Sequence, residues 1–171
     1  MRIFLTGYMG SGKSTLGKRL ANKLGISFID LDGYFEQKYK TSISLFFERF
    51  GEVSFRQLEH EVLKEVIEKF DDVVISSGGG TPCYDENMDL MNRHGTTVYM
   101  KLPAGVLASR LSNSPFRYKR PMLKGLDKDS MLQTISRHLE EREVFYSQSK
   151  IVIDAHKSSV ENIAELISNV I

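Results

Sequence analysis

The sequence predicts an α/β protein in which helices flank a five-stranded parallel sheet. Short runs of β-branched and aromatic residues alternate along the 171 residues with longer segments of helical periodicity. The short runs are continuously apolar at their centres, as expected for strands buried on both faces of a sheet. The first run leads directly into a glycine-rich loop and then into a helical segment. A chain of this length fits a single domain, residues 1–171.

The predicted elements follow in a regular order. Strands are expected at 3–6, 27–30, 73–77, 97–102 and 151–154. Helices are expected at 13–24, 32–40, 43–50, 53–70, 85–93, 104–111, 129–147 and 158–170. Ser158, followed three residues later by Glu161, predicts a capping box at the start of the last helix. Because strands and helices alternate, we expect right-handed crossovers and a parallel sheet.

The composition argues against several classes of protein. The 23 Lys and Arg residues nearly balance the 22 Asp and Glu residues, which argues against a general binder of nucleic acid or membrane surfaces. A single cysteine, Cys83, allows no internal disulfide, and the four histidines show no metal-ligand spacing. No apolar run approaches the length of a transmembrane helix, and the chain opens on a strand without a signal peptide. We therefore expect a cytoplasmic protein.

A phosphate-binding loop is the most specific motif. Residues 7–15 read GYMGSGKST and match the pattern G-x-x-x-x-G-K-[ST]. Glycines let successive backbone N–H groups point inward, and the next helix presents its positive N-terminal end to the same anion. Lys13 can reach the terminal phosphates of a nucleotide, and the Ser14 hydroxyl can bind Mg²⁺. The residues expected at the phosphates are Gly10, Ser11, Gly12, Lys13, Ser14 and Thr15.

Further candidate residues follow the second and third strands. Ligands of open α/β sheets bind beyond the carboxyl ends of the strands. One of the two aspartates Asp30 and Asp32 could join the Mg²⁺ shell through waters, and Asp30 is the best replacement for the acidic residue that is missing at the end of the third strand. The other could accept a proton from a substrate hydroxyl or align it; the alternative for Asp32 is a role as helix N-cap and first-turn acid. The run of Gly78, Gly79 and Gly80 predicts a close approach to the backbone, or a bare turn.

Basic residues supply the remaining candidates. Arg56 and Glu59 lie three apart on one helix and could form a pair that fixes the guanidinium. Arg142 lies near the end of the seventh helix, and two converging arginines would suit a carboxylate. The alternative for both is a solvated surface charge. The basic stretch from Arg110 to Lys124 contains two prolines and no acidic residue, which favours either a solvated loop or a lid closing over polyphosphate.

Taken in order, these residues give the chain a resemblance to the shikimate kinases, which are small P-loop kinases. The resemblance covers essentially the whole length. It depends on GYMGSGKST at 7–15, the aspartates at 30 and 32, FRQLE at 55–59, SGGG at 77–80, RPML at 120–123 and REVFY at 142–146. It implies a three-layer P-loop kinase fold with a substrate-binding segment at 32–60 and a mobile lid at 110–125. Met122 and Val144 depart from the leucine and proline usual in two of these motifs.

The resemblance also implies roles. It makes the chain an ATP:shikimate phosphotransferase that uses Mg²⁺ and phosphorylates the 3-hydroxyl. The implied catalytic residues are Lys13, Asp32 and Arg120, of which Arg120 also binds nucleotide. The implied shikimate-binding residues are Asp32, Arg56, Gly78, Gly79, Gly80 and Arg142, and the implied Mg²⁺ residues are Ser14 and Asp30. We expect a monomer that binds shikimate and ATP, without nucleic-acid or membrane partners.

Two alternatives share the phosphate-binding loop. A kinase of another small hydroxy acid, such as gluconate, would differ only in its acceptor-side residues. A nucleotide-dependent switch would need the guanine motif N-K-x-D. The corresponding segment starting at Asn22 ends in Gly25 and falls within the first helix. The D-x-x-G match starting at Asp30 also comes too soon after the phosphate-binding loop.

Overall fold

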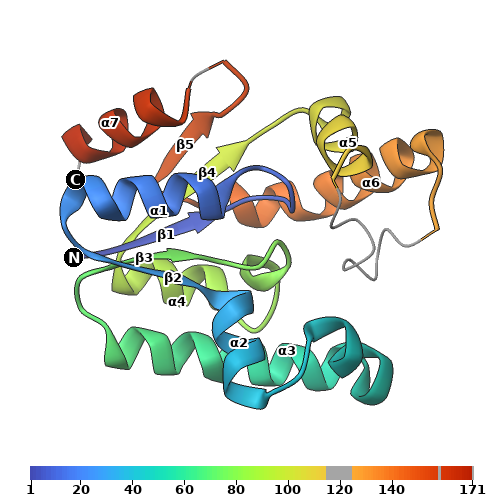
Figure 1. Cartoon of the computed structure of the whole chain (residues 1–171), viewed down its shortest axis with the longest axis horizontal. Helices are drawn as coiled ribbons and strands as arrows, with labels where there is room; N and C mark the ends of the chain where they lie inside the picture. The colour runs from blue at the N-terminus through green and yellow to red at the C-terminus, as the bar shows by residue number, and fades with distance from the viewer. Residues whose placement is uncertain (115–124, 158, 171) are drawn as a thin grey trace.

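The computed structural model describes residues 1–114, 125–157 and 159–170. Its centre is a five-stranded parallel sheet in the order β2-β3-β1-β4-β5 (Figure 1). The strands are β1 (Arg2–Thr6), β2 (Ser27–Asp30), β3 (Val73–Ser76), β4 (Thr96–Lys101) and β5 (Ile151–Asp154). All five predicted strands are confirmed, with boundaries shifted by at most one residue.

Helices cover both faces of the sheet. They are α1 (Lys13–Leu24), α2 (Leu31–Tyr39), α3 (Ile43–Lys69), α4 (Asn87–His94), α5 (Ala104–Ser112), α6 (Lys128–Tyr146) and α7 (Val160–Val170), with a short 3₁₀ helix η1 (Thr81–Cys83) after β3. Figure 1 shows α1 and α7 side by side on one face, and α3 and α4 on the other. The expected three-layer arrangement is therefore confirmed.

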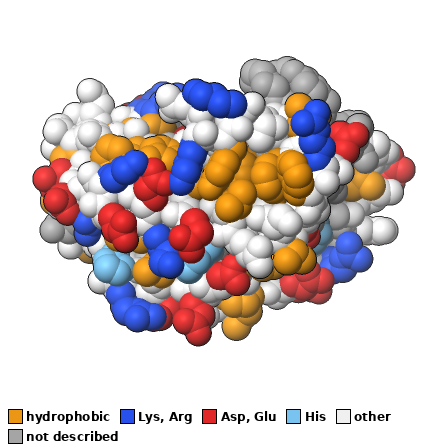
Figure 2. Space-filling model, turned by 90° about the horizontal axis from the view of Figure 1, so that it is seen from below, with side chains coloured by type: hydrophobic (Ala, Val, Ile, Leu, Met, Phe, Trp, Pro, Cys, Tyr) orange, Lys and Arg blue, Asp and Glu red, His pale blue; other side chains and the backbone are white. Residues whose placement is uncertain are grey.

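Two apolar cores lie on the two faces of the sheet. Successive side chains of a strand point to opposite faces, so β1 contributes Ile3 and Leu5 to one core and Phe4 to the other. Helices α1, α5, α6 and α7 close the first core, and α2, α3 and α4 close the second. Figure 2, which views the molecule from the side of α3 and α4, shows charges of both signs interspersed. Among the described helices, none is long and apolar enough to cross a membrane.

At α3, α4 and α7 the structure differs from the sequence prediction by more than a one-residue shift of a helix end. The expected helices at 43–50 and 53–70 form one kinked element, with the break at Gly51, whose φ of 77° is left-handed. Helix α4 starts two residues late because Asp85 and Glu86 both have positive φ. At α7 the Ser159 hydroxyl accepts from the Asn162 backbone N–H at 3.1 Å. The predicted cap, Ser158, lies outside the described residues.

Candidate active site

A cavity of about 580 Å³ opens at the carboxyl ends of β1, β2 and β3. Figure 1 shows the phosphate-binding loop, the start of α2 and the segment after β3 gathered at this end of the sheet. Of the predicted site residues, those that line the cavity are Gly10, Gly12, Lys13, Ser14, Thr15, Asp30, Asp32, Arg56, Gly78, Gly79, Gly80 and Arg142. Ser11 is buried and does not line it. One cavity therefore unites residues from five separate segments.

The phosphate-binding loop takes its shape from glycines at left-handed positions. Gly10 and Gly12 have φ of 81° and 98°, and a side chain would strain the backbone at either position. Gly12 is also the N-cap of α1, so the positive end of this helix faces the cavity. The Lys13 ammonium donates to the carbonyl oxygens of Gly7 at 2.7 Å and Tyr8 at 3.0 Å. The loop thus supplies both backbone N–H groups and a fixed positive charge for an anion.

A hydroxyl and a carboxylate meet beside the loop. Ser14 Oγ donates to Asp30 Oδ2 at 2.5 Å and lies 3.3 Å from Ser76 Oγ. Asp30 Oδ1 also accepts from the Gly33 N–H at 3.2 Å and caps α2. The capping role considered for Asp32 therefore belongs to Asp30. Within the described ranges, no group of three or more His, Cys, Asp or Glu could hold a metal. A hydroxyl with one carboxylate suits Mg²⁺, which commonly keeps several waters and phosphate oxygens as ligands.

Asp32 has the chemistry of a proton acceptor. Its side chain lines the cavity. Desolvation by the surrounding protein, with the negative charges of Glu59 and Asp30, raises the pKa of Asp32 from 3.8 to about 7, while Lys13 and Arg56 oppose the shift. A Cβ at Gly78 would lie 2.8 Å from Asp32 Oδ1, so the glycine makes room for this carboxyl. A carboxyl that titrates near neutral pH can accept a proton from a hydroxyl.

Arg56 lies in a buried ion-pair network and not on the surface. It is 8% exposed, and its Nη1 donates to Glu59 Oε2 at 2.7 Å. Glu59 is 3% exposed and also accepts from Thr81 Oγ1 at 2.6 Å. Glu52 and the face of the Tyr84 ring, 4.3 Å from the Arg56 Cζ, hold the guanidinium from other sides. The sequence predicted the pair with Glu59, but Thr81 was missed because it lies on a different element.

Arg142 reaches the same cavity from α6. It is 7% exposed, and its Cζ lies 5.4 Å from the centre of the Tyr8 ring. The alternative of a solvated charge is therefore wrong for Arg142, as it is for Arg56. Helix α6 continues to Tyr146 through Val144, which is exposed, so valine at the usual proline position leaves the helix intact. The Tyr146 hydroxyl donates to the Gly79 carbonyl, which ties α6 to the glycine run.

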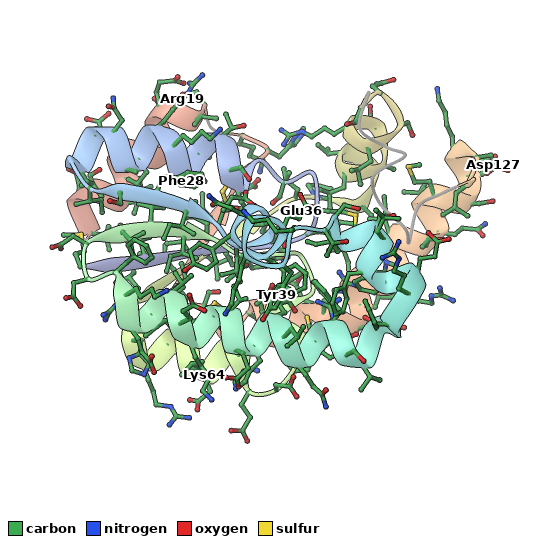
Figure 3. The ribbon with its side chains drawn as sticks, turned by 60° about the horizontal axis from the view of Figure 1, so that its bottom comes forward. Arg19, Phe28, Glu36, Tyr39, Lys64 and Asp127 are labelled. Atoms are coloured by element: carbon green, nitrogen blue, oxygen red, sulfur yellow. The ribbon has the colours of Figure 1, made fainter. Side chains whose placement is uncertain are left out.

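Some contributors were not predicted. The cavity wall also includes Met9, Gly33, Glu36, Ile43, Phe47, Phe55, Glu59, Ser76 and Ser77. Glu36, which Figure 3 labels on α2, accepts from the N–H of Ile43, the first residue of α3, at 2.9 Å. The apolar wall residues resemble ordinary core residues in the sequence, so no local signal marks them. Arg110 lies 3.4 Å from the Gly10 and Ser11 carbonyl oxygens. Arg120 and most of the predicted lid at 110–125 lie outside the described residues.

Fold and site together define a class. A phosphate-binding loop at the carboxyl edge of a parallel sheet faces a cavity that contains a titratable carboxyl and two arginines. This combination is that of a P-loop small-molecule kinase.

Comparison with known proteins identifies the family. The family model for shikimate kinase matches residues 9–171. A shikimate kinase of Parabacteroides distasonis is 46% identical over 98% of this chain and 95% of its own length. The crystal structure of shikimate kinase from Bacteroides thetaiotaomicron covers 99% of this chain and 97% of its own, with a TM-score of 0.92 and 41% identity. The chain belongs to the shikimate kinase family of ATP-dependent phosphotransferases.

Two further structures bear on the acceptor. A shikimate kinase from Acinetobacter baumannii, solved in complex with shikimate, has a TM-score of 0.89, with 29% identity, over 99% of this chain and 91% of its own. A gluconokinase from Sinorhizobium meliloti has a TM-score of only 0.55 and 20% identity over 96% of this chain and 87% of its own, which shows a shared fold alone. The resemblance inferred from the sequence is confirmed, and the alternatives of a gluconate kinase and a nucleotide switch lose their support.

Proposed function

We propose that the chain transfers the γ-phosphoryl group of ATP to the 3-hydroxyl of shikimate. One observation supports this most directly. The phosphate-binding loop, the Asp32 carboxyl and two buried arginines line a single cavity. The related Acinetobacter baumannii enzyme, which was solved with shikimate, supports the choice of acceptor.

The arginines are assigned to the shikimate carboxylate. Arg56 and Arg142 both line the cavity, and planar guanidinium groups bind a carboxylate through two parallel hydrogen bonds. Glu59 and the Tyr84 ring hold Arg56 in place, so little side-chain entropy is lost when the substrate binds. Backbone groups of the glycine run could contact the substrate closely, because no side chain intervenes. These contacts would fix the ring with its hydroxyl directed toward Asp32.

The nucleotide side requires charge neutralisation. Lys13 would leave its carbonyl partners and contact the terminal phosphates, together with the N–H groups of the loop. Ser14 and Asp30 are the residues that would hold Mg²⁺, completed by waters and phosphate oxygens. When bound, this ion would neutralise negative charge on the phosphates. Asp32 would accept the proton of the attacking hydroxyl, or align that hydroxyl, with its raised pKa matched to neutral pH.

Other features stay predictions from the sequence. These are the phosphate-contacting role of Arg120, the substrate-binding segment at 32–60, the lid at 110–125, the monomeric state and the cytoplasmic location. Arg120→Ala should lower kcat by orders of magnitude if this arginine neutralises the transferred group. A kcat within about threefold of the wild type would contradict that role.

A coupled assay of ADP release tests the function. The chain should turn over with shikimate and Mg-ATP but not with gluconate; turnover with gluconate alone would refute the assignment. Arg142→Ala should cost about 2–3 kcal/mol of substrate interaction, or about 30- to 150-fold in KM for shikimate. Arg137→Ala is the matched control, because Arg137 is exposed on the same helix and does not line the cavity. If Arg142→Ala raised the KM for ATP and left the KM for shikimate unchanged, the assignment of Arg142 to shikimate rather than to the nucleotide would be wrong.

A further inference from the structure

One face of α6 carries three buried polar side chains that the proposed reaction uses only in part. His138, Arg142 and Tyr146 are spaced four apart, and their exposed fractions are 6%, 7% and 0%. Side chains at this spacing lie on the same side of a helix. Arg142 reaches the cavity, whereas His138 and Tyr146 do not line it. His138 and Tyr146 could therefore affect substrate binding only through the residues that they contact.

Tyr8, in the phosphate-binding loop, connects this face to the nucleotide side. Its hydroxyl shares a hydrogen bond of 2.8 Å with His138 Nδ1, and its ring lies 5.4 Å from the Cζ of Arg142. Its carbonyl oxygen accepts from the Lys13 ammonium at 3.0 Å. Tyr8 is 1% exposed and is not part of the cavity wall. Its ring therefore contacts the arginine assigned to the substrate and its carbonyl contacts the lysine of the phosphate-binding loop, although the residue does not line the cavity.

We propose that Tyr8 is a positioning residue for Arg142 and that His138 fixes the orientation of the Tyr8 ring. This inference rests on the proposed function, in which Arg142 binds the shikimate carboxylate. A guanidinium over the face of a tyrosine is attracted by the ring, and the attraction is strongest where water is excluded. The ring contacts the face of the guanidinium, whereas a carboxylate is bound through the N–H edges. Without the ring, Arg142 would sample more rotamers and bind the carboxylate less well.

His138 is suited to hold the hydroxyl because it stays neutral. Burial and the positive charge of Arg142 lower the pKa of His138 below its ordinary value. A neutral imidazole adds no repulsion toward Arg142, and its Nδ1 can accept from the Tyr8 hydroxyl. The contact spans 130 positions of sequence, so it also ties the phosphate-binding loop to α6. The same helix is tied to the glycine run by the hydrogen bond from Tyr146 to Gly79.

Steady-state kinetics and ligand binding on substituted enzymes test the proposal. Tyr8→Leu removes the ring and should raise the KM and the calorimetric Kd for shikimate by about 5- to 30-fold. Tyr8→Phe keeps the ring and should raise them by only about 2- to 5-fold. His138→Phe, which removes the same hydrogen bond from the other side, should match Tyr8→Phe. The Kd for ADP should stay within about twofold in all three.

A double-mutant cycle separates positioning from general destabilisation. In an Arg142→Ala background, Tyr8→Leu should have no further effect on shikimate affinity, because its partner is gone. Thr97→Val is the control, since it removes a buried hydroxyl that donates to Asn92 Oδ1 at 2.6 Å away from the cavity, and it should leave both affinities unchanged. Equal losses of shikimate and ADP affinity in Tyr8→Leu, or full additivity with Arg142→Ala, would overturn the proposal. Failure of the wild type to bind or phosphorylate shikimate would instead refute the proposed function.

Discussion

Gly80→Ala is a sharp test of how closely the glycine run and Arg56 are fitted together. A Cβ at this position would lie 2.5 Å from Arg56 Nη2 and 2.8 Å from both Cζ and Nη1. The backbone at Gly80 has φ −93° and ψ −20°, which alanine adopts without strain. The effect of the substitution is therefore purely steric and directed at one guanidinium.

The cost depends on whether Arg56 can move aside. The guanidinium is held by Glu59 at 2.7 Å, by Glu52 at 3.2 Å and by the Tyr84 ring, so a shift breaks a buried ion pair. Overpacking of this kind costs about 1–3 kcal/mol, and replacing glycine by alanine returns about 0.4–1 kcal/mol through the unfolded chain. We expect a net loss of about 1–2 kcal/mol in the free energy of unfolding, which lowers Tm by about 2–8 °C.

Activity should respond more strongly than stability. A displaced Arg56 should raise the KM for shikimate by at least about tenfold, since a charge-assisted hydrogen bond contributes about 1.5–3 kcal/mol. The KM for ATP should change by less than about twofold, and kinetics with thermal melts measure both effects. Gly105→Ala is the control, because a Cβ there meets nothing within 4 Å, and it should leave both constants unchanged. An unchanged Tm and an unchanged KM for shikimate in Gly80→Ala would refute the reasoning.

Three more predictions concern charged groups of the cavity. Lys13→Ala should stay folded but lose most activity and most of the ATP-dependent rise in Tm, which mass action gives the wild type; an equal rise in both proteins would contradict the phosphate-binding role. Glu59→Gln should lower the free energy of unfolding by about 3 kcal/mol in urea titrations, because a buried guanidinium loses its partner; a loss under about 1 kcal/mol would show that Glu52 alone compensates Arg56. For Asp32 the folded pKa, about 7, exceeds the ordinary value of 3.8, so the folded chain keeps a proton that the unfolded chain releases. Stability should therefore fall as pH rises from about 4 to 7, and Asp32→Asn should become progressively more stable than the wild type over that range while losing activity; parallel pH profiles of Tm would count against the raised pKa.

The most local features of the site were predictable from the sequence. The phosphate-binding loop is encoded by consecutive residues whose glycines permit the left-handed angles observed, so five of its six predicted contact residues line the cavity. Ser11 is the exception, because it is buried and does not line the cavity. Asp30 and Asp32 were placed at the cavity by their position at the carboxyl end of β2. Which of the two caps α2 was decided only by the structure.

The sequence by itself determined the order of strands and helices, the phosphate chemistry and the pairing of Arg56 with Glu59, because these depend on residues a few positions apart. Only the tertiary structure decided the strand order, the burial of both arginines and the contacts between residues far apart in the sequence. Thr81 lies 22 positions from Glu59, and His138 lies 130 positions from Tyr8. Such contacts form because the parallel sheet brings distant loops to one edge and α6 packs beside them. The periodicity and spacing of residues in the sequence do not predict which distant side chains come into contact.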